Sequence, residues 1–147
     1  MKLSTNFTLD EMTRSQTATR HGIPNDPTDE EIRNLADLCE QILERVRAYF
    51  GAPVLISSGY RSKALNLRIG GSVNSQHCRG EAADFTVAGR SVREVFDYIR
   101  TSALPFDQVI DEFGGWVHVS HTRGRGNRRE SLRATRVNGR AYYSRIN

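Results

Sequence analysis

Residues 75–84 read S-Q-H-C-R-G-E-A-A-D, and residues 116–120 read W-V-H-V-S. Together they contain His77, Asp84 and His118, residue types that bind zinc through nitrogen or oxygen. Catalytic zinc sites commonly have three protein ligands and one open position, whereas structural sites usually have four protein ligands. The two stretches therefore predict a catalytic metal site, and the rest of the chain is expected to bring them together.

The neighbouring histidines and cysteine are weaker candidates for metal ligands. Cys78 is adjacent to His77, and because adjacent residues rarely bind one metal we interpret it as a free thiol. His121 falls on the strand face opposite His118 by the period-two rule. His21 lies beside an expected helix end, where histidines more often contact carbonyl groups. The predicted ligand set therefore stays at three residues.

If such a metal site hydrolyses its substrate it also needs a general base, and the sequence offers two candidates. Residues 108–121 read as a β-hairpin that turns at a Gly-Gly pair. With a two-residue turn, Asp111 pairs directly with His118 and shares its face. With a three-residue loop, Glu112 shares that face instead. The alternation of side-chain faces along the strand is therefore compatible with either Asp111 or Glu112 as the general base.

Helical and strand patterns surround these stretches and favour an α+β fold. N-cap residues predict four helix starts, at Thr8, Thr28, Ser62 and Ser91. The longest helix, from residue 28 to about residue 50, carries an apolar stripe at steps of three and four. A short buried strand is expected at residues 54–57, and another at residues 82–87. The stripe consists of Ile32, Leu35, Cys39, Ile42, Val46 and Tyr49.

Length and composition indicate one globular domain. The chain has 147 residues, 37% of them hydrophobic, which is enough to build a single core. No apolar run approaches the roughly 18 residues that a membrane span needs. The first ten residues contain no apolar stretch typical of a secretory signal, so synthesis in the cytoplasm is expected. Two cysteines are too few for a disulfide framework.

Basic charge is concentrated at the C-terminal end. Residues 1–121 contain 13 Lys and Arg against 16 Asp and Glu, whereas residues 122–147 contain eight Arg and one Glu. The second segment reads as a basic loop and a hairpin that turns at Asn138 and Gly139. We expect it to pack on the domain formed by residues 1–121. Its charge would attract polyanions, which include nucleic acid, anionic lipid and anionic wall polymers.

Three ordered motifs carry a resemblance to a known family. The pattern S-x-H-x-x-G-x-A-x-D, followed by W-x-H-x-S, resembles the zinc D-Ala-D-Ala carboxypeptidases. Those enzymes include vancomycin-resistance dipeptidases and phage L-alanyl-D-glutamate endolysins, and share their fold with the hedgehog signalling domain. S-S-G-Y-R-S at residues 57–62 and G-G-S-V-N-S at residues 70–75 match further family segments. The resemblance covers residues 7–121.

The resemblance implies roles for particular residues. It implies zinc as the cofactor, Arg61 as a ligand of a substrate carboxylate or carbonyl oxygen, and Ser75 as a substrate contact. Trp116 is a further candidate for substrate binding. It favours Glu112 as the general base, because E-F precedes W-V-H in similar sequences. Other branches place the acid three residues before the last histidine, where this chain has Gly115.

The implied fold packs helices on one face of a small, mostly antiparallel sheet, with zinc in a cleft on the open face. The implied activity is hydrolysis of a peptide bond in peptidoglycan stem peptides, as a D-Ala-D-Ala carboxypeptidase or an L-Ala-D-Glu-type endopeptidase. A phage or prophage lysis enzyme, acting on the wall after release, fits this pattern.

Two other functions are weighed against hydrolysis. One is a non-catalytic zinc module of the same fold that binds the cell wall. Retention of an acid beside the hairpin argues against it. The other is a nucleic-acid binder that uses the arginines and the Tyr142-Tyr143 pair. The mildly acidic remainder of the chain argues against specific nucleic-acid binding.

Overall fold

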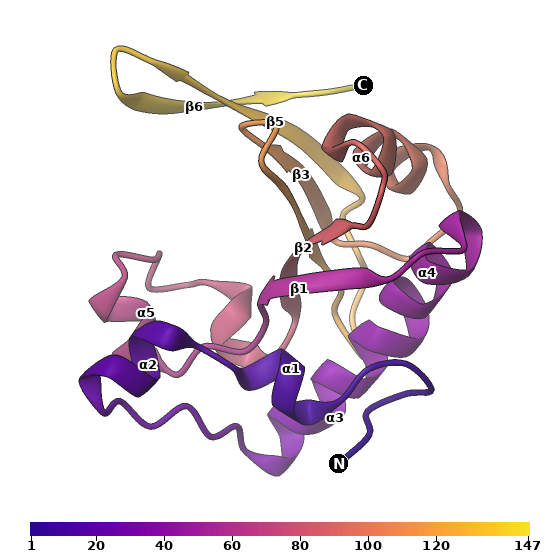
Figure 1. Cartoon of the computed structure of the whole chain (residues 1–147). Helices are drawn as coiled ribbons and strands as arrows, with labels where there is room; N and C mark the ends of the chain where they lie inside the picture. The colour runs from indigo at the N-terminus through magenta and orange to yellow at the C-terminus, as the bar shows by residue number, and fades with distance from the viewer.

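A six-stranded mixed sheet runs through the molecule in the order β1-β2-β4-β3-β5-β6 (Figure 1). The computed structural model describes residues 1–147. Every neighbouring pair is antiparallel except β3 and β5, which are parallel. The expected α+β fold with a mostly antiparallel sheet is confirmed. The strands are β1 (Val54–Ser58), β2 (Ala82–Val87), β3 (Gln108–Glu112), β4 (Trp116–Ser120), β5 (Glu130–Val137) and β6 (Arg140–Arg145).

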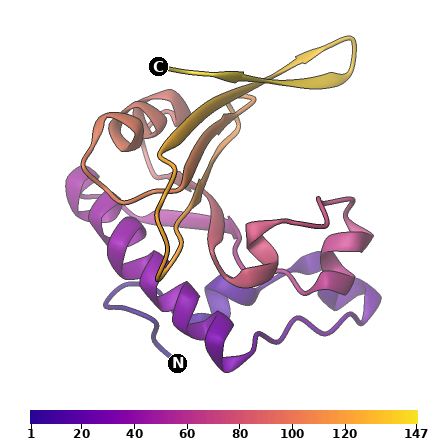
Figure 2. The ribbon, with the colours of Figure 1, turned by 180° about the vertical axis from the view of Figure 1, so that it is seen from behind.

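The larger helices cover one face of this sheet. The continuous helix α3 (Asp29–Leu38), η1 (Cys39–Leu43) and α4 (Glu44–Phe50) lies on the same side as α6 (Val92–Thr101), whereas α5 (Lys63–Arg68) lies on the other side (Figures 1 and 2). Side chains of the covered face join the helices in one core cluster. None of the helices is long and apolar enough to cross a membrane. The strand residues in the core include Ala83, Phe85, Val109, Val117 and Val119.

The predicted helix starts are all present. The side chains of Thr8, Thr28, Ser62 and Ser91 each accept a hydrogen bond from a backbone amide in the first turn of a helix. The first two are full capping boxes, with Glu11 and Glu31 bonding back to the N-cap amide. The first helical region is divided into α1 (Leu9–Thr13) and α2 (Gln16–His21).

The long helix departs from its predicted stripe at a π-helical turn. Cys39–Leu43 forms this turn, which inserts an extra residue and rotates the helix face that follows. As a result Phe50 is buried, whereas Tyr49 is 64% exposed and stacks on Tyr98 of α6. The assignment of Tyr49 to the buried stripe was therefore wrong, because a constant step of 3.6 residues does not hold across the turn.

The C-terminal segment belongs to the same sheet. Asn138 and Gly139 have φ values of 52° and 79°, the positive angles that a type I′ turn requires, and they join β5 to β6. The β5–β6 hairpin projects beyond the helices in both views (Figures 1 and 2). β5 starts beside Gln108, where β4 ends, so residues 121–129 must cross the foot of β3.

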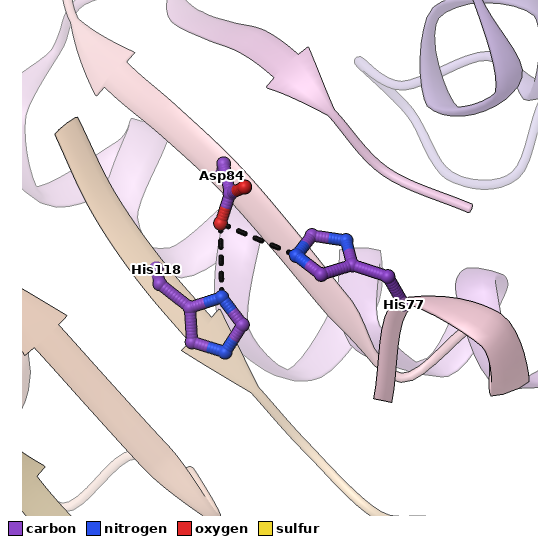
Figure 3. Close-up of side chains that lie close together, drawn as sticks. All are labelled: His77, Asp84 and His118. Carbon is purple, nitrogen blue, oxygen red and sulfur yellow. Dashed lines mark hydrogen bonds and ion pairs between the residues drawn. The ribbon is translucent and has the colours of Figure 1, made fainter. Parts of the chain in front are cut away.

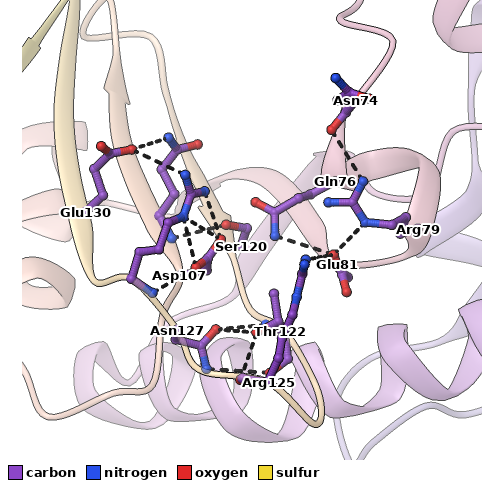
Figure 4. A network of polar contacts seen from close by, with 12 residues as sticks. Asn74, Gln76, Arg79, Glu81, Asp107, Ser120, Thr122, Arg125, Asn127 and Glu130 are labelled. Carbon is purple, nitrogen blue, oxygen red and sulfur yellow. Dashed lines mark hydrogen bonds and ion pairs between the residues drawn. The ribbon is translucent and has the colours of Figure 1, made fainter.

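This crossover loop, residues 121–129, is held by buried polar groups. The backbone amide and guanidinium of Arg128 donate to the carboxylate of Asp107 at 2.8–3.2 Å. Asn127 accepts from the amide of Thr122 at 2.9 Å (Figure 4). Asp107 is buried, and its hydrogen bonds with Arg128 hold its pKa below the usual range despite burial. The predicted basic loop is therefore anchored to the start of β3.

Candidate active site

Strand register places two of the predicted ligands side by side. Asp84 of β2 and His118 of β4 are direct cross-strand partners, on the face opposite the core. His77 enters from η2 (Gln76–Arg79), the short helix before β2. Its Nε2 lies 3.3 Å from Asp84 Oδ1, and His118 Nδ1 lies 2.9 Å from the same oxygen (Figure 3). One ligand atom from each residue falls within 4.8 Å of the others.

His77 is oriented by the backbone of the neighbouring S-S-G-Y-R-S segment. Its Nδ1 donates to the carbonyl oxygen of Gly59 at 2.6 Å, which leaves the Nε2 lone pair directed at the site. The amide of Arg61 donates to the His77 carbonyl at 3.1 Å. The hydroxyl of Ser75 accepts from the His77 amide at 3.2 Å. The S-S-G-Y-R-S segment precedes the predicted ligands in the sequence. In the folded chain it contacts and orients the first of them, His77.

Gly59 has no room for a side chain. A Cβ at this position would lie 2.4 Å from the backbone oxygen of Met12, which accepts a hydrogen bond from the amide of Tyr60 at 2.7 Å. We expect Gly59→Ala to destabilise the fold by about 1–3 kcal/mol, the usual cost of overpacking, and to weaken metal binding by moving the carbonyl that orients His77.

Thermal unfolding and zinc titration would measure both effects. Gly126→Ala is a matched control, because a Cβ there meets nothing within 4 Å and the position does not have positive φ. Equal stability and equal metal affinity in the two variants would contradict the expected role of Gly59.

The protonation states of His77 and Asp84 suit a divalent cation. Burial lowers the pKa of His77, so its imidazole is neutral and can donate a lone pair. Burial alone would raise the pKa of Asp84, but the two imidazoles outweigh it and hold this pKa well below its usual range. Two nitrogens and one carboxylate oxygen with an open side form a donor set that fits zinc.

The hairpin loop decides which acid faces the ligands. Glu112 pairs with Trp116 and Ile110 pairs with His118, so the loop contains three residues and Glu112 shares the face of His118. Burial raises the pKa of Glu112, and the nearby Asp84 charge adds to this rise. Of the two carboxylates, Glu112 is therefore the one that faces the cleft with His118.

Asp111 points to the opposite face. Its carboxylate accepts from the amide of Gly114 at 3.0 Å and from Arg133 Nε at 3.3 Å. These contacts close the hairpin turn and tie β3 to β5. Asp111 therefore supports the turn and does not face the predicted metal ligands.

Arg61 is placed beside the ligands with part of its charge unmatched. Its Nε is buried and has no hydrogen-bond partner. Burial lowers the pKa of its guanidinium. An unpaired buried donor is costly, so this atom favours an anionic or carbonyl oxygen as its partner. The arginine also lies at the boundary between the cleft and a smaller cavity next to β1 and α2.

The comparison with known families agrees with these observations. A family model described as Peptidase M15 matches residues 5–120, most of the chain. The chain belongs to the Peptidase M15 family. The resemblance drawn from the three motifs is thereby confirmed, and all the predicted site residues lie inside the matched region. A search of curated proteins finds no match.

The cleft of this M15 peptidase has a volume of about 920 Å³. Ser75 and Trp116 line it together with the three predicted ligands, Glu112 and Arg61. Ser75 also forms the loop hydrogen bond to His77, so it reaches the cleft from a fixed position.

The remaining histidines and cysteine of this M15 peptidase have other neighbours. His121 contacts Asp37 at 2.7 Å and the carbonyl of Pro105 at 2.6 Å, on the side of the core. His21 lies beside Arg68, and Cys78 is a buried free thiol. None of them joins the cluster of possible ligands.

One wall of the cleft comes from residues that the sequence did not suggest. Arg125, Arg128, Leu132 and Tyr143, all beyond the region matched by the M15 model, line the cleft opposite the His77 loop. Arg125 and Arg128 belong to the crossover loop, whereas Leu132 and Tyr143 belong to the β5–β6 hairpin that the turn at Asn138 and Gly139 predicted. No sequence signal predicted which strand that hairpin would join, and that pairing brings these side chains to the site.

Polar contacts join the two walls. Buried Glu81 accepts from Arg79 Nε at 2.9 Å, and from Gln76 and Arg125 at 3.4 Å each (Figure 4). The backbone oxygen of Glu81 also accepts from the amide of His121 at 2.9 Å. Two arginines share one carboxylate, so the cleft keeps a surplus of positive charge at this end.

Proposed function

We propose that this M15 peptidase hydrolyses a peptide bond in peptidoglycan stem peptides with a zinc cofactor. The observation that carries this proposal is the convergence of three metal-binding side chains, a buried carboxylate and an unpaired arginine on one cleft. Each is a part that amide hydrolysis requires, and each comes from a different segment of the chain. An arrangement that served binding alone would not need a buried acid beside the metal ligands.

His77, Asp84 and His118 are the proposed zinc ligands. When bound, zinc supplies a Lewis acid that activates water and polarises an amide carbonyl. Asp84 provides the negative charge, and the two neutral imidazoles leave the metal with net positive charge. The Gly59 carbonyl fixes the tautomer of His77 and therefore which of its nitrogens faces the metal.

Glu112 is the proposed general base and acid. Its carboxylate is buried on the cleft face, and its raised pKa favours both accepting a proton from water and returning it to the leaving amine. Partial exclusion of water strengthens the interactions of a charge that forms beside it. Asp111 is proposed to have a structural role only.

Arg61, Ser75 and Trp116 are the proposed substrate contacts. The Arg61 guanidinium can form paired hydrogen bonds with a carboxylate or carbonyl oxygen of the substrate. Further arginines line the cleft and favour a substrate that carries negative charge, which stem peptides do through their carboxylates. Trp116 offers an aromatic surface at the same rim.

We further propose a cell-wall lysis role of the phage or prophage kind. In this proposal a peptidase domain, residues 1–121, is made in the cytoplasm and acts on the wall after release. The basic segment 122–147 is proposed to form part of the same domain. Its exposed arginines would attract anionic wall polymers.

Incubation of the zinc-loaded protein with purified peptidoglycan tests the proposal. Release of free D-alanine, identified by mass spectrometry, would show a carboxypeptidase. New amino termini within the stem peptide would show an endopeptidase. Glu112→Gln in parallel controls for contaminating hydrolases. A folded, zinc-loaded wild type that releases no product from several wall types would overturn the proposal in favour of a binding module.

A further inference from the structure

The β5–β6 hairpin follows the residues that the M15 model matches. It reaches Glu112, the proposed general base. The hydroxyl of Tyr143 donates to Glu112 Oε2 at 3.4 Å, and Tyr143 lines the same cleft as the metal ligands. We propose that Tyr143 is a positioning residue for Glu112, supplied by the C-terminal segment. This inference rests on the proposed function for its catalytic consequence, but the contact itself does not depend on it.

Strand register makes the contact a built feature of the sheet. Tyr143 of β6 pairs with Ala134 of β5, Ala134 pairs with Glu112 of β3, and Glu112 pairs with Trp116 of β4. Partners in register project from the same face of a sheet. The four side chains therefore form one row on the cleft face, adjacent to the row that contains His118 and Asp84.

The residue between the two partners is small. Ala134 is buried and has only a methyl group, so the ring of Tyr143 can extend across β5 towards Glu112. A larger side chain at this position would fill the space through which the phenol approaches. The small Ala134 therefore leaves room for the long Tyr143 side chain to reach Glu112.

Two further contacts hold the β5–β6 hairpin in place beside the loop that follows Glu112. The guanidinium of Arg136 in β5 lies 4.2 Å from the centre of the Phe113 ring. The amide of Phe113 donates to the carbonyl oxygen of Ala134 at 3.1 Å. Because both contacts involve the residue after Glu112, they limit movement of the hairpin relative to the carboxylate.

One oxygen of Glu112 is thereby assigned to the phenol. Hydrogen bonding of Oε2 to Tyr143 restricts rotation of the carboxylate and leaves Oε1 for proton transfer. Such positioning affects the chemical step more than the affinity for substrate. The raised pKa of the half-exposed Tyr143 phenol, caused by partial desolvation and by the neighbouring Glu112 charge, agrees with this arrangement.

Steady-state kinetics test the effect of Tyr143 on catalysis. The substrate is a peptide that the wild type cleaves. Tyr143→Phe removes only the hydroxyl, and we expect kcat to fall about 3- to 10-fold, the net value of one hydrogen bond, with KM and zinc content unchanged. Tyr142→Phe is the matched control, because Tyr142 lies on the opposite face of β6 and does not line the cleft. An unchanged kcat, or a raised KM with kcat unchanged, would overturn the proposal.

Absorbance titration of the phenols gives a readout that needs no turnover. Glu112→Gln should lower the titration midpoint of one tyrosine, and this shift should be absent when Tyr143→Phe is combined with it. If Glu112→Gln shifts the tyrosine titration equally with and without Tyr143→Phe, the contact with Glu112 is refuted. A wild type that cleaves no peptide would refute the proposed function, and this titration would still decide the contact.

Discussion

Glu112→Gln is expected to lower kcat by about 100- to 10,000-fold, the usual contribution of a general acid–base group. The substitution keeps the size of the side chain and removes its ability to accept a proton. Zinc content should stay the same, because Glu112 is not among the three predicted ligands. Turnover of purified stem peptide and metal analysis of the same preparation would measure the two quantities.

Asp111→Asn is the matched control for this variant. Asp111 is the adjacent carboxylate, and it contacts Gly114 and Arg133 on the face away from the ligands. We expect reduced stability in thermal unfolding and nearly unchanged kcat. If Asp111→Asn abolished turnover while Glu112→Gln kept it, the assignment of the general base would be wrong.

His77→Ala is expected to remove zinc from the purified protein. Loss of a ligand should weaken metal affinity by more than the roughly 10- to 100-fold that follows loss of a supporting residue. Activity should disappear with the metal, and zinc added after chelation should restore activity only to the wild type. Titration with zinc, followed by metal analysis, would measure the affinity and the stoichiometry.

His21→Ala tests whether the effect is specific to the site. His21 is exposed near Arg68 and lies outside the ligand cluster. This variant should retain one zinc ion and full activity. A His77→Ala protein that still held one tightly bound zinc ion would contradict the proposed ligand set.

Local patterns in the sequence predicted much of this structure. Capping residues are short-range signals, and the helices that they predicted at Thr28 and Ser91 are present. The ordered motifs predicted that Asp84 and His118 would come together, and β2 and β4 pair them directly. These predictions succeed because each depends on residues within one element, or on a combination of motifs that is specific to one family.

The loop between β3 and β4 shows why the sequence alone could not choose between Asp111 and Glu112 as the general base. Gly114 and Gly115 are the natural pair for a tight turn, yet the positive φ angles fall on Phe113, at 59°, and Gly114, at 69°. A left-handed conformation is unfavourable for an aromatic residue, so sequence alone would not place Phe113 there. Tertiary contacts with Ala134 and Arg136 accompany this conformation.

The wall formed by the C-terminal segment was beyond sequence reasoning for a different reason. Period-two patterns assign the faces of a strand but do not identify its neighbours in a sheet. The parallel pairing of β5 with β3 brings Tyr143 to Glu112, and it depends on the crossover loop anchored at Asp107. Long-range pairing of this kind becomes visible only in the folded chain.

The order of the strands also gives the two parts of the active site different local stabilities. β2 and β4, which carry Asp84 and His118, each have a paired strand on both sides, so exposing their backbone breaks hydrogen bonds with two neighbours. β6, which carries Tyr143, is an edge strand with one neighbour and can open by itself. Substitutions in the hairpin can therefore reshape the wall of the cleft over evolutionary time while the predicted metal ligands stay in place.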